Sequence, residues 1–277
     1  MKLTTRRSFL RGLAVSPVLL ATPALAVATS HVGGSAFGTY WRVLSAGSRQ
    51  EQFVEDLARS TFSEIDRAMS PYNPTSDLSR FNMGDGSDTG TPSADLLTVA
   101  DAALALSRIS GGAFDPTVGP TVGRFGFGPI SGPQTGNWRG IAITDGILQK
   151  SVPGLTLDLC GIAKGYAIDK LARGLMAEGM TDWLIDLGGE LRAMGQHPSG
   201  RDWRASVANP FVADGQGMAV LSLGGRAVAT SGITENGYDI GGRWVSHLID
   251  PVLVRPIDSH LLSVSVLTQA AMQAFLT

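Results

Sequence analysis

Two hydrophobic patterns divide this sequence, and their order along the chain limits the fold class more than any other feature. Apolar residues recur at helical spacing in the first half, over residues 51–69 and again from about Ser93 to Ser107. The second half consists mostly of short apolar runs separated by turns, which is typical of strands. Helices and strands grouped in this way favour an α+β fold. We therefore predict one α+β domain, with either a single core or two lobes whose strands share a sheet.

Local signals place the remaining elements. Asp145-Gly146 lies between two short apolar runs and predicts a hairpin turn. The segment 70–82 is polar and contains two prolines, and the segment 111–132 is too rich in glycine and proline for a regular element. We expect a helix from 160 to 178, a short helix at 269–277, and strands at 39–46, 141–143, 147–150, 155–159, 183–187, 203–208, 218–223, 226–230, 243–249 and 261–267.

The first 26 residues predict an export signal rather than part of the fold. Arg6 and Arg7 precede a moderately apolar stretch that ends in Ala24-Leu25-Ala26, a small-x-small cleavage pattern. This arrangement is typical of twin-arginine export, although an ordinary secretory signal with two arginines is an alternative. The apolar stretch is short and interrupted by proline, so it is a poor membrane span, and no later segment resembles one. We therefore expect a periplasmic domain at 27–277.

Charge and cysteine content exclude some functions. The chain has a net charge of −2, and removing residues 1–26, which contain four basic and no acidic residues, leaves −6. An acidic domain is a poor candidate for nucleic-acid binding. The single cysteine, Cys160, excludes an intramolecular disulfide, and we expect it to be a buried filler of the core. Because twin-arginine export carries folded proteins, a bound cofactor is plausible.

The segment "LDLCGIAKGYAIDK", residues 157–170, carries the first candidate binding residues. Asp158 ends an apolar run, and Lys164 lies near the start of the expected helix. A helix N-terminus favours anions over lysine, so a phosphate held between that terminus and Lys164 would resolve the conflict. Asp158 could instead cap the helix, and Lys164 could be a solvated surface residue.

His247, in "SHLIDP", is the candidate general base. Histidine is the side chain whose ordinary pKa suits proton abstraction near neutral pH. A structural histidine on a strand is the alternative. Asp186 and Glu190, in "WLIDLGGELRAMG", are expected to be structural before they are functional.

Several motifs together resemble one family. The segments "GGAFDPTVGP", "LDLCGIAKGYAIDK", "WLIDLGGELRAMG", "RAVATSG" and "SHLIDP" occur in the order found in the ApbE family of FAD:protein FMN transferases, and the resemblance covers about residues 35–277. It implies a two-lobed, T-fold-like α+β structure with FAD in a cleft between the lobes and Mg²⁺ beside the pyrophosphate. The implied reaction moves FMN from FAD to a threonine hydroxyl of an acceptor protein and releases AMP.

The resemblance also assigns roles to residues. It implies that the Gly161 carbonyl binds Mg²⁺ and that His247 or a nearby carboxylate activates the threonine. Phe114 could instead belong to the core of a structural turn, and Tyr72 could be an ordinary loop residue. The implied FAD contacts are Phe37, Tyr72, Ala113, Phe114, Asp115, Asp158 and Lys164.

The C-terminus departs from the family pattern. The family has D-A-x-x-T after an "SVSV" strand, and its Asp and Thr complete the Mg²⁺ site. Here Gln273 takes the Asp position, while Ala274 and Thr277 fit the spacing. A neutral oxygen should weaken Mg²⁺ binding. The chain is therefore expected to be the transferase with reduced activity; an exported FAD carrier or maturation factor and an FAD pyrophosphatase are the alternatives. Family members serve respiratory complexes and nitrous oxide reductase maturation, among other acceptors, and the sequence names none.

Overall fold

The computed structural model describes residues 29–46, 50–85, 91–211, 217–234 and 236–275. Its centre is a six-stranded, fully antiparallel sheet in the order β1-β2-β5-β6-β9-β14. Strands from both ends of the chain therefore share one sheet. The signal predicted at 1–26 lies outside the described residues. The strands are β1 Thr29–Ala36, β2 Thr39–Ala46, β5 Trp183–Leu187, β6 Glu190–Met194, β9 Ala227–Gly232 and β14 Ser263–Thr268.

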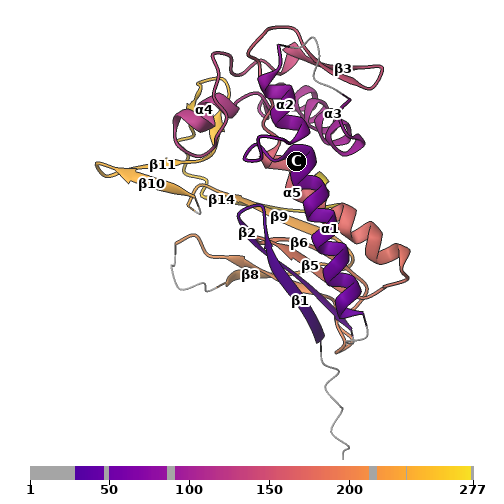
Figure 1. The fold of residues 1–277 in the computed structure, drawn as a ribbon. Coiled ribbons are helices and arrows are strands. Elements are labelled where there is room, and N and C mark those ends of the chain that lie inside the picture. Colours follow the sequence, from indigo (N-terminus) through magenta and orange to yellow (C-terminus); the bar gives the residue numbers. More distant parts are fainter. Residues whose placement is uncertain (1–28, 47–49, 86–90, 212–216, 235, 276–277) are drawn as a thin grey trace, which may run out of the picture.

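Helices α1 (Glu51–Met69) and α5 (Cys160–Ala177) cover one face of this sheet (Figure 1). The buried positions of α1 recur at helical spacing and, with α5 and the sheet, form the main core. The hairpin of β7 (Arg204–Ala208) and β8 (Gly217–Ser222) covers the other face with a smaller core. Strand β5 is consequently buried on both faces, because alternate residues enter the two cores.

A second lobe lies beyond one end of the sheet (Figure 1). Together with the sheet and its helices it gives the two-lobed α+β architecture that we predicted. None of the described helices is long and apolar enough to span a bilayer. The elements of this lobe are α2 Asp77–Met83, α3 Ala94–Ile109, α4 Gly119–Arg124, η1 Trp138–Gly140, β3 Ile141–Thr144, β4 Ile147–Lys150, β10 Gly237–Ile240, β11 Arg243–Ser246, β12 Ile249–Asp250 and β13 Arg255–Pro256.

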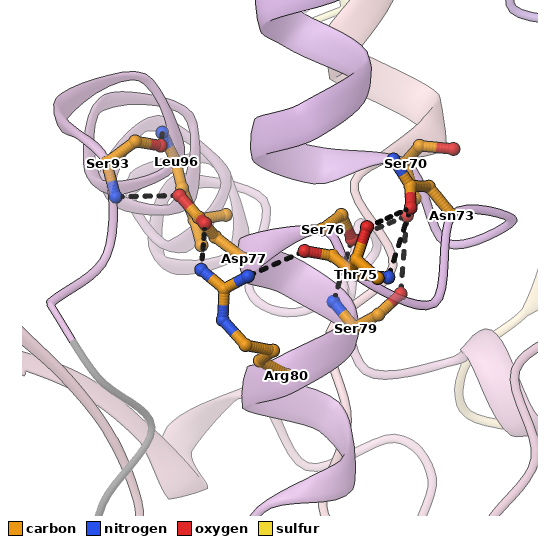
Figure 2. A network of polar contacts seen from close by, with 9 residues as sticks. All are labelled: Ser70, Asn73, Thr75, Ser76, Asp77, Ser79, Arg80, Ser93 and Leu96. Carbon is orange, nitrogen blue, oxygen red and sulfur yellow. Dashed lines mark hydrogen bonds and ion pairs between the residues drawn. The ribbon is translucent and has the colours of Figure 1, made fainter.

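Helix α2 arises within the polar segment 70–82, where we expected none. The Ser76 hydroxyl caps it by accepting the Ser79 N–H at 3.0 Å, and it also donates to the Ser70 carbonyl at 2.7 Å. Asp77 accepts the Ser93 N–H at 2.9 Å and so ties α2 to the start of α3 (Figure 2). Capping by short polar side chains thus turns a proline-containing loop into an ordered helix.

Other predictions need correction. Helix α4 lies within 111–132, which we expected to be irregular. Residues 155–159 form no strand, although we expected one there, and β1 was not predicted. The expected strand 243–249 is divided between β11 and β12, and the C-terminal helix is one 3₁₀ turn, η2 (Met272–Phe275).

Candidate active site

The chain enters α5 through residues 155–158, where hydrogen bonds from side chains take the place of pairing with a neighbouring strand. The Asn82 amide donates to the Leu157 carbonyl at 2.8 Å and accepts the Leu157 N–H at 2.7 Å. The buried Lys150 ammonium donates to three backbone carbonyls, those of Phe81, Asn82 and Leu155, at 2.9–3.2 Å. Burial lowers the pKa of Lys150. These contacts satisfy backbone groups that a neighbouring strand would otherwise pair with. The spacing of apolar residues in the sequence does not reveal them.

Asp158 shapes the first turn of α5. One of its carboxylate oxygens accepts the Cys160 N–H at 2.9 Å, and its own N–H donates to the Pro116 carbonyl at 2.7 Å. The N-cap residue of α5 is Leu159, so Asp158 does not cap the helix as an N-cap; it instead closes the turn that leads into it. The side chain is only half-buried, so it also remains near enough to solvent to meet a ligand.

Tyr72, Phe114 and Gly161 gather at the same helix start. Partial burial, followed by the neighbouring Cys160 and Asp158 groups, raises the pKa of the Tyr72 phenol, which is 68% exposed. A Cβ atom at Gly161 would lie 3.5 Å from Cε2 of Phe114, so the Phe114 ring packs against the first turn. The structure thus brings together residues from three separate sequence motifs at the N-terminus of α5.

Hydrogen bonds to the Asp115 side chain order the loop around it. Asp115 is buried, and one carboxylate oxygen accepts both the N–H and the hydroxyl of Thr117, at 2.8 and 2.6 Å. The other oxygen accepts the Trp138 N–H at 3.3 Å. Asp115 therefore orders the loop, whereas Ala113 is exposed and can present its backbone to a ligand. Thr117, which we did not predict, belongs to the same network.

Phe37 lies in the turn between β1 and β2. Its backbone adopts a left-handed conformation with φ of 51°, and its ring packs edge-on against Phe62 at 5.6 Å between centroids. The half-buried ring contributes to the main core, so Phe37 can offer only its exposed portion to a ligand.

Two ion pairs of opposite orientation join α5 to β6. Lys164 of the helix contacts Glu190 of the strand, and Asp169 of the helix contacts Arg192 of the strand. Five residues of helix rise about 7.5 Å and two residues of strand about 6.6 Å, so the spacings match. A shift of α5 along β6 by the distance between the two pairs would bring Lys164 against Arg192 in one direction or Asp169 against Glu190 in the other, so the pairs favour the observed register.

Glu190 is the more buried partner of Lys164. It is 6% exposed, and its second carboxylate oxygen has no hydrogen-bond partner among the described residues. Burial raises the pKa of Glu190, and the Lys164 ammonium opposes that shift. Lys164, whose side chain is about one-third exposed, is therefore not the freely solvated residue that we considered as an alternative.

Asp186 has the structural role that we ranked first. It is buried and accepts the Gly189 N–H and the Arg42 Nε–H, both at 2.9 Å. These contacts hold the β5–β6 turn, in which a Cβ at Gly188 would lie 2.7 Å from Oγ1 of Thr39. The turn therefore requires glycine at position 188. It places Glu190, the first residue of β6, beside α5.

His247 lies in a second cluster, between the β10–β11 and β12–β13 hairpins. Its Nδ1 is 3.0 Å from the Asn236 carbonyl, which can only accept, so Nδ1 is the donor and Nε2 keeps a lone pair. The ring also packs on Phe127, which in turn stacks on Tyr238 at 5.3 Å. This tautomer is the one that a general base requires.

The residues implied for a Mg²⁺ site do not form one by themselves. The Gln273 side chain is exposed, and Thr277 lies outside the described residues. Gly161 and Gln273 offer only uncharged oxygens, whereas Mg²⁺ prefers carboxylates and phosphates. Across the described part of the chain, no cluster of three or more His, Cys, Asp or Glu could hold a metal ion.

Cys160 is exposed, so the prediction of a buried filler was wrong. It is the first residue of α5 and is not among the buried positions of that helix. Desolvation by the surrounding chain and the negative charge of Asp158 raise the pKa of the thiol. Cys160 is therefore protonated at neutral pH and is a poor nucleophile.

This leads to a reactivity prediction. At pH 8 we expect iodoacetamide to alkylate Cys160 in the folded protein several-fold more slowly than a free cysteine, because its raised pKa leaves less thiolate. Mass spectrometry against time would measure the rate, with the urea-unfolded protein as the reference. Asp158→Asn should accelerate the reaction, and equal rates in the folded and unfolded protein would contradict the assignment.

Comparisons with known proteins agree with this architecture. The sequence model of the ApbE family matches residues 37–275. The FAD:protein FMN transferase of Vibrio cholerae serotype O1 is 32% identical over 261 residues, covering 88% of this chain and 78% of that protein. The FAD:protein FMN transferase of Escherichia coli K12 is 31% identical over 260 residues, covering 87% and 74%.

Solved structures give the same result. The flavin transferase ApbE from Vibrio cholerae superposes with a TM-score of 0.79 at 31% identity, covering 90% of this chain and 84% of that one. The apo form of the Pseudomonas stutzeri flavinyl transferase ApbE gives 0.78 at 28% identity, with coverage of 90% and 82%. On sequence and on fold, this chain belongs to the ApbE family.

Proposed function

We propose that this protein transfers FMN from FAD to a threonine hydroxyl of an acceptor protein and releases AMP. The relatives at 31–32% identity carry the name FAD:protein FMN transferase, which supports an enzyme that uses FAD and a protein acceptor. The observation that carries the proposal is the gathering of Tyr72, Phe114, Asp158 and Lys164 around the first turns of α5. A helix N-terminus of this kind favours a phosphate group.

The proposed chemistry needs one bond to form and one to break. The threonine oxygen attacks the phosphorus atom of the FMN half of FAD, and the pyrophosphate bond to AMP breaks. The threonine proton passes to Nε2 of His247, whose Nδ1–H is held by the Asn236 carbonyl. AMP leaves with the bridging oxygen. The amide groups at the start of α5 and the Lys164 ammonium would balance charge on the phosphates.

We further propose that residues 1–26 direct the folded protein to the periplasm by the twin-arginine route. The paired arginines and the small-x-small site support this. Expression with Arg6 and Arg7 replaced by lysine, followed by cell fractionation, would test it. Unchanged periplasmic accumulation would favour an ordinary secretory signal instead.

A single assay tests the activity. The mature protein is incubated with FAD, Mg²⁺ and a candidate acceptor domain, and covalent flavin is followed by fluorescence on a denaturing gel. Fluorescent acceptor with release of AMP supports the transferase. Bound FAD without transfer at any Mg²⁺ concentration indicates a carrier, FMN and AMP without acceptor indicate a pyrophosphatase, and no affinity for FAD excludes all three.

The tail makes a separate prediction about Mg²⁺. Because Gln273 supplies no charge, we expect the free protein to bind Mg²⁺ weakly, and Gln273→Asp to tighten binding at least about ten-fold. Isothermal titration of both proteins without FAD would measure this. Gln273→Glu and Gln273→Asn are the controls for charge and for size. Equal affinities for the wild type and Gln273→Asp would show that residue 273 does not face the metal position.

A further inference from the structure

The C-terminal segment Ala271–Phe275 is tied directly to α5 by a buried carboxylate. Asp169 is 4% exposed, and its two oxygens accept the backbone N–H groups of Ala271 and Met272 at 2.8 and 2.9 Å. Arg192 of β6 contacts the same carboxylate and neutralises it. The sequence alone assigns no role to Asp169, which stands among both polar and apolar residues of the predicted helix.

Gly165 lets this segment lie on the helix. A Cβ atom there would approach the Ala271 carbonyl oxygen to 2.8 Å and the Met272 Cα to 2.9 Å, and both are backbone atoms that cannot rotate away. The segment therefore crosses α5 in direct backbone contact. The close approach at Gly165 and the hydrogen bonds to Asp169 thus show independently that the C-terminal segment is attached to α5.

The attachment lies beside the candidate site. Gly161, Gly165 and Asp169 are four residues apart and so share one face of α5, with a rise of about 6 Å between neighbours. The segment thus crosses the helix one turn from Gly161 and next to the turn that carries Lys164. Met272 packs on the main core, whereas Gln273 is exposed.

We infer that Asp169 is a positioning residue, which holds the segment Ala271–Phe275 against α5 so that it forms one wall of the FAD site. The choice of FAD as the ligand rests on the proposed function, whereas the attachment of the segment to α5 is observed directly. Asp169 touches neither FAD nor acceptor; it acts through the two amides that it fixes.

A matched pair of variants tests this role. Asp169→Asn removes the charge and one acceptor oxygen from the attachment. Asp95→Asn is the control, because Asp95 on α3 also binds α5, accepting from the Tyr166 hydroxyl at 2.7 Å and from Lys170 at 2.6 Å, but does not touch the C-terminal segment. Fluorescence titration gives the FAD affinity, amide hydrogen exchange at Ala271 and Met272 reports the attachment, and melting temperature reports general stability.

We expect Asp169→Asn to raise the Kd for FAD at least ten-fold and to speed exchange at the two amides at least ten-fold. Asp95→Asn should lower the melting temperature but leave both readouts within two-fold of the wild type. Unchanged FAD affinity in Asp169→Asn, or an equal loss of affinity in Asp95→Asn, would overturn the inference. Absence of FAD binding in the wild type would instead overturn the proposed function.

A second variant decides the question if Asp169→Asn does not fold. Gly165→Ala keeps every charge and improves the helix propensity of α5, but its methyl group must displace the segment. We expect it to weaken FAD binding at least ten-fold without loss of helical circular dichroism. Wild-type affinity in Gly165→Ala would overturn the inference.

Discussion

Replacing His247 with alanine is expected to reduce the rate of FMN transfer by about 10²–10⁴-fold, the usual contribution of a general base. Nε2 of His247 keeps its lone pair because the Asn236 carbonyl holds the Nδ1–H at 3.0 Å. The affinity for FAD should change much less, since the proposed FAD contacts lie around the start of α5. Single-turnover transfer to the acceptor and a separate FAD titration would measure the two effects.

His197→Ala is the control for the histidine prediction. His197 lies in an exposed turn, where its Nδ1 is 2.8 Å from the Ser199 hydroxyl. We expect this variant to transfer FMN at the wild-type rate. If His247→Ala retained more than a tenth of the wild-type rate, another group, such as a carboxylate, would have to accept the threonine proton.

Replacing Lys164 with alanine is expected to lower the free energy of unfolding by about 3 kcal/mol at pH 8, because it leaves Glu190 buried without its partner. For a protein of this size, that corresponds to a fall in melting temperature of about 6–12 °C. The loss should be smaller at pH 5. Burial raises the pKa of Glu190, so the folded state favours the protonated carboxyl. Without Lys164, the stability that comes from a protonated Glu190 is present at low pH and is lost as the pH rises through its folded-state pKa.

Urea unfolding at pH 5 and pH 8 would measure the pH dependence. Adding Glu190→Gln to Lys164→Ala should recover most of the loss at pH 8, because the uncompensated charge is gone. An equal loss at both pH values, or no recovery in the double variant, would contradict this account.

Lys170→Ala is the control for this pH dependence, because the carboxylates that Lys170 contacts have lowered rather than raised pKa values. Hydrogen bonds from Lys170 lower the pKa of Glu64, and hydrogen bonds from Lys170 and Tyr166 outweigh burial to lower that of Asp95. Stability from these carboxylates is present above their unfolded pKa values, near 4, and is lost only as the pH falls further. The effect of Lys170→Ala should therefore be nearly the same at pH 8 and pH 5.

Elements with strong local signals were predictable from the sequence. Helices α1, α3 and α5 follow the apolar spacing, and the β3–β4 hairpin follows Asp145-Gly146, whose φ angles of 52° and 73° suit that turn. Helix α2 was missed because serine caps, rather than an apolar stripe, define its start. The strand expected at 155–159 was wrong because a buried segment is apolar whether or not it pairs as a strand.

The candidate site divides in the same way. The motifs indicated Tyr72, Phe114, Asp158 and Lys164 as binding residues, and the structure brings these four together. Their roles toward FAD remain predictions, as do those of Phe37, Ala113 and Asp115. The role of Asp169 had no sequence signal, because an acidic residue in a solvated helix has the same local pattern as one that lies beneath a crossing segment.

By itself, the sequence determined the α+β class, the family and the order of most helices and strands, since these depend on local spacing and turn chemistry. Only the tertiary structure decided which charges meet. The antiparallel sheet and the register of α5 on β6 bring Lys164 to Glu190, Asp169 to Arg192, and the C-terminal amides to Asp169. Those contacts join residues up to 103 positions apart, and their register is set by packing across the whole domain rather than by any local pattern.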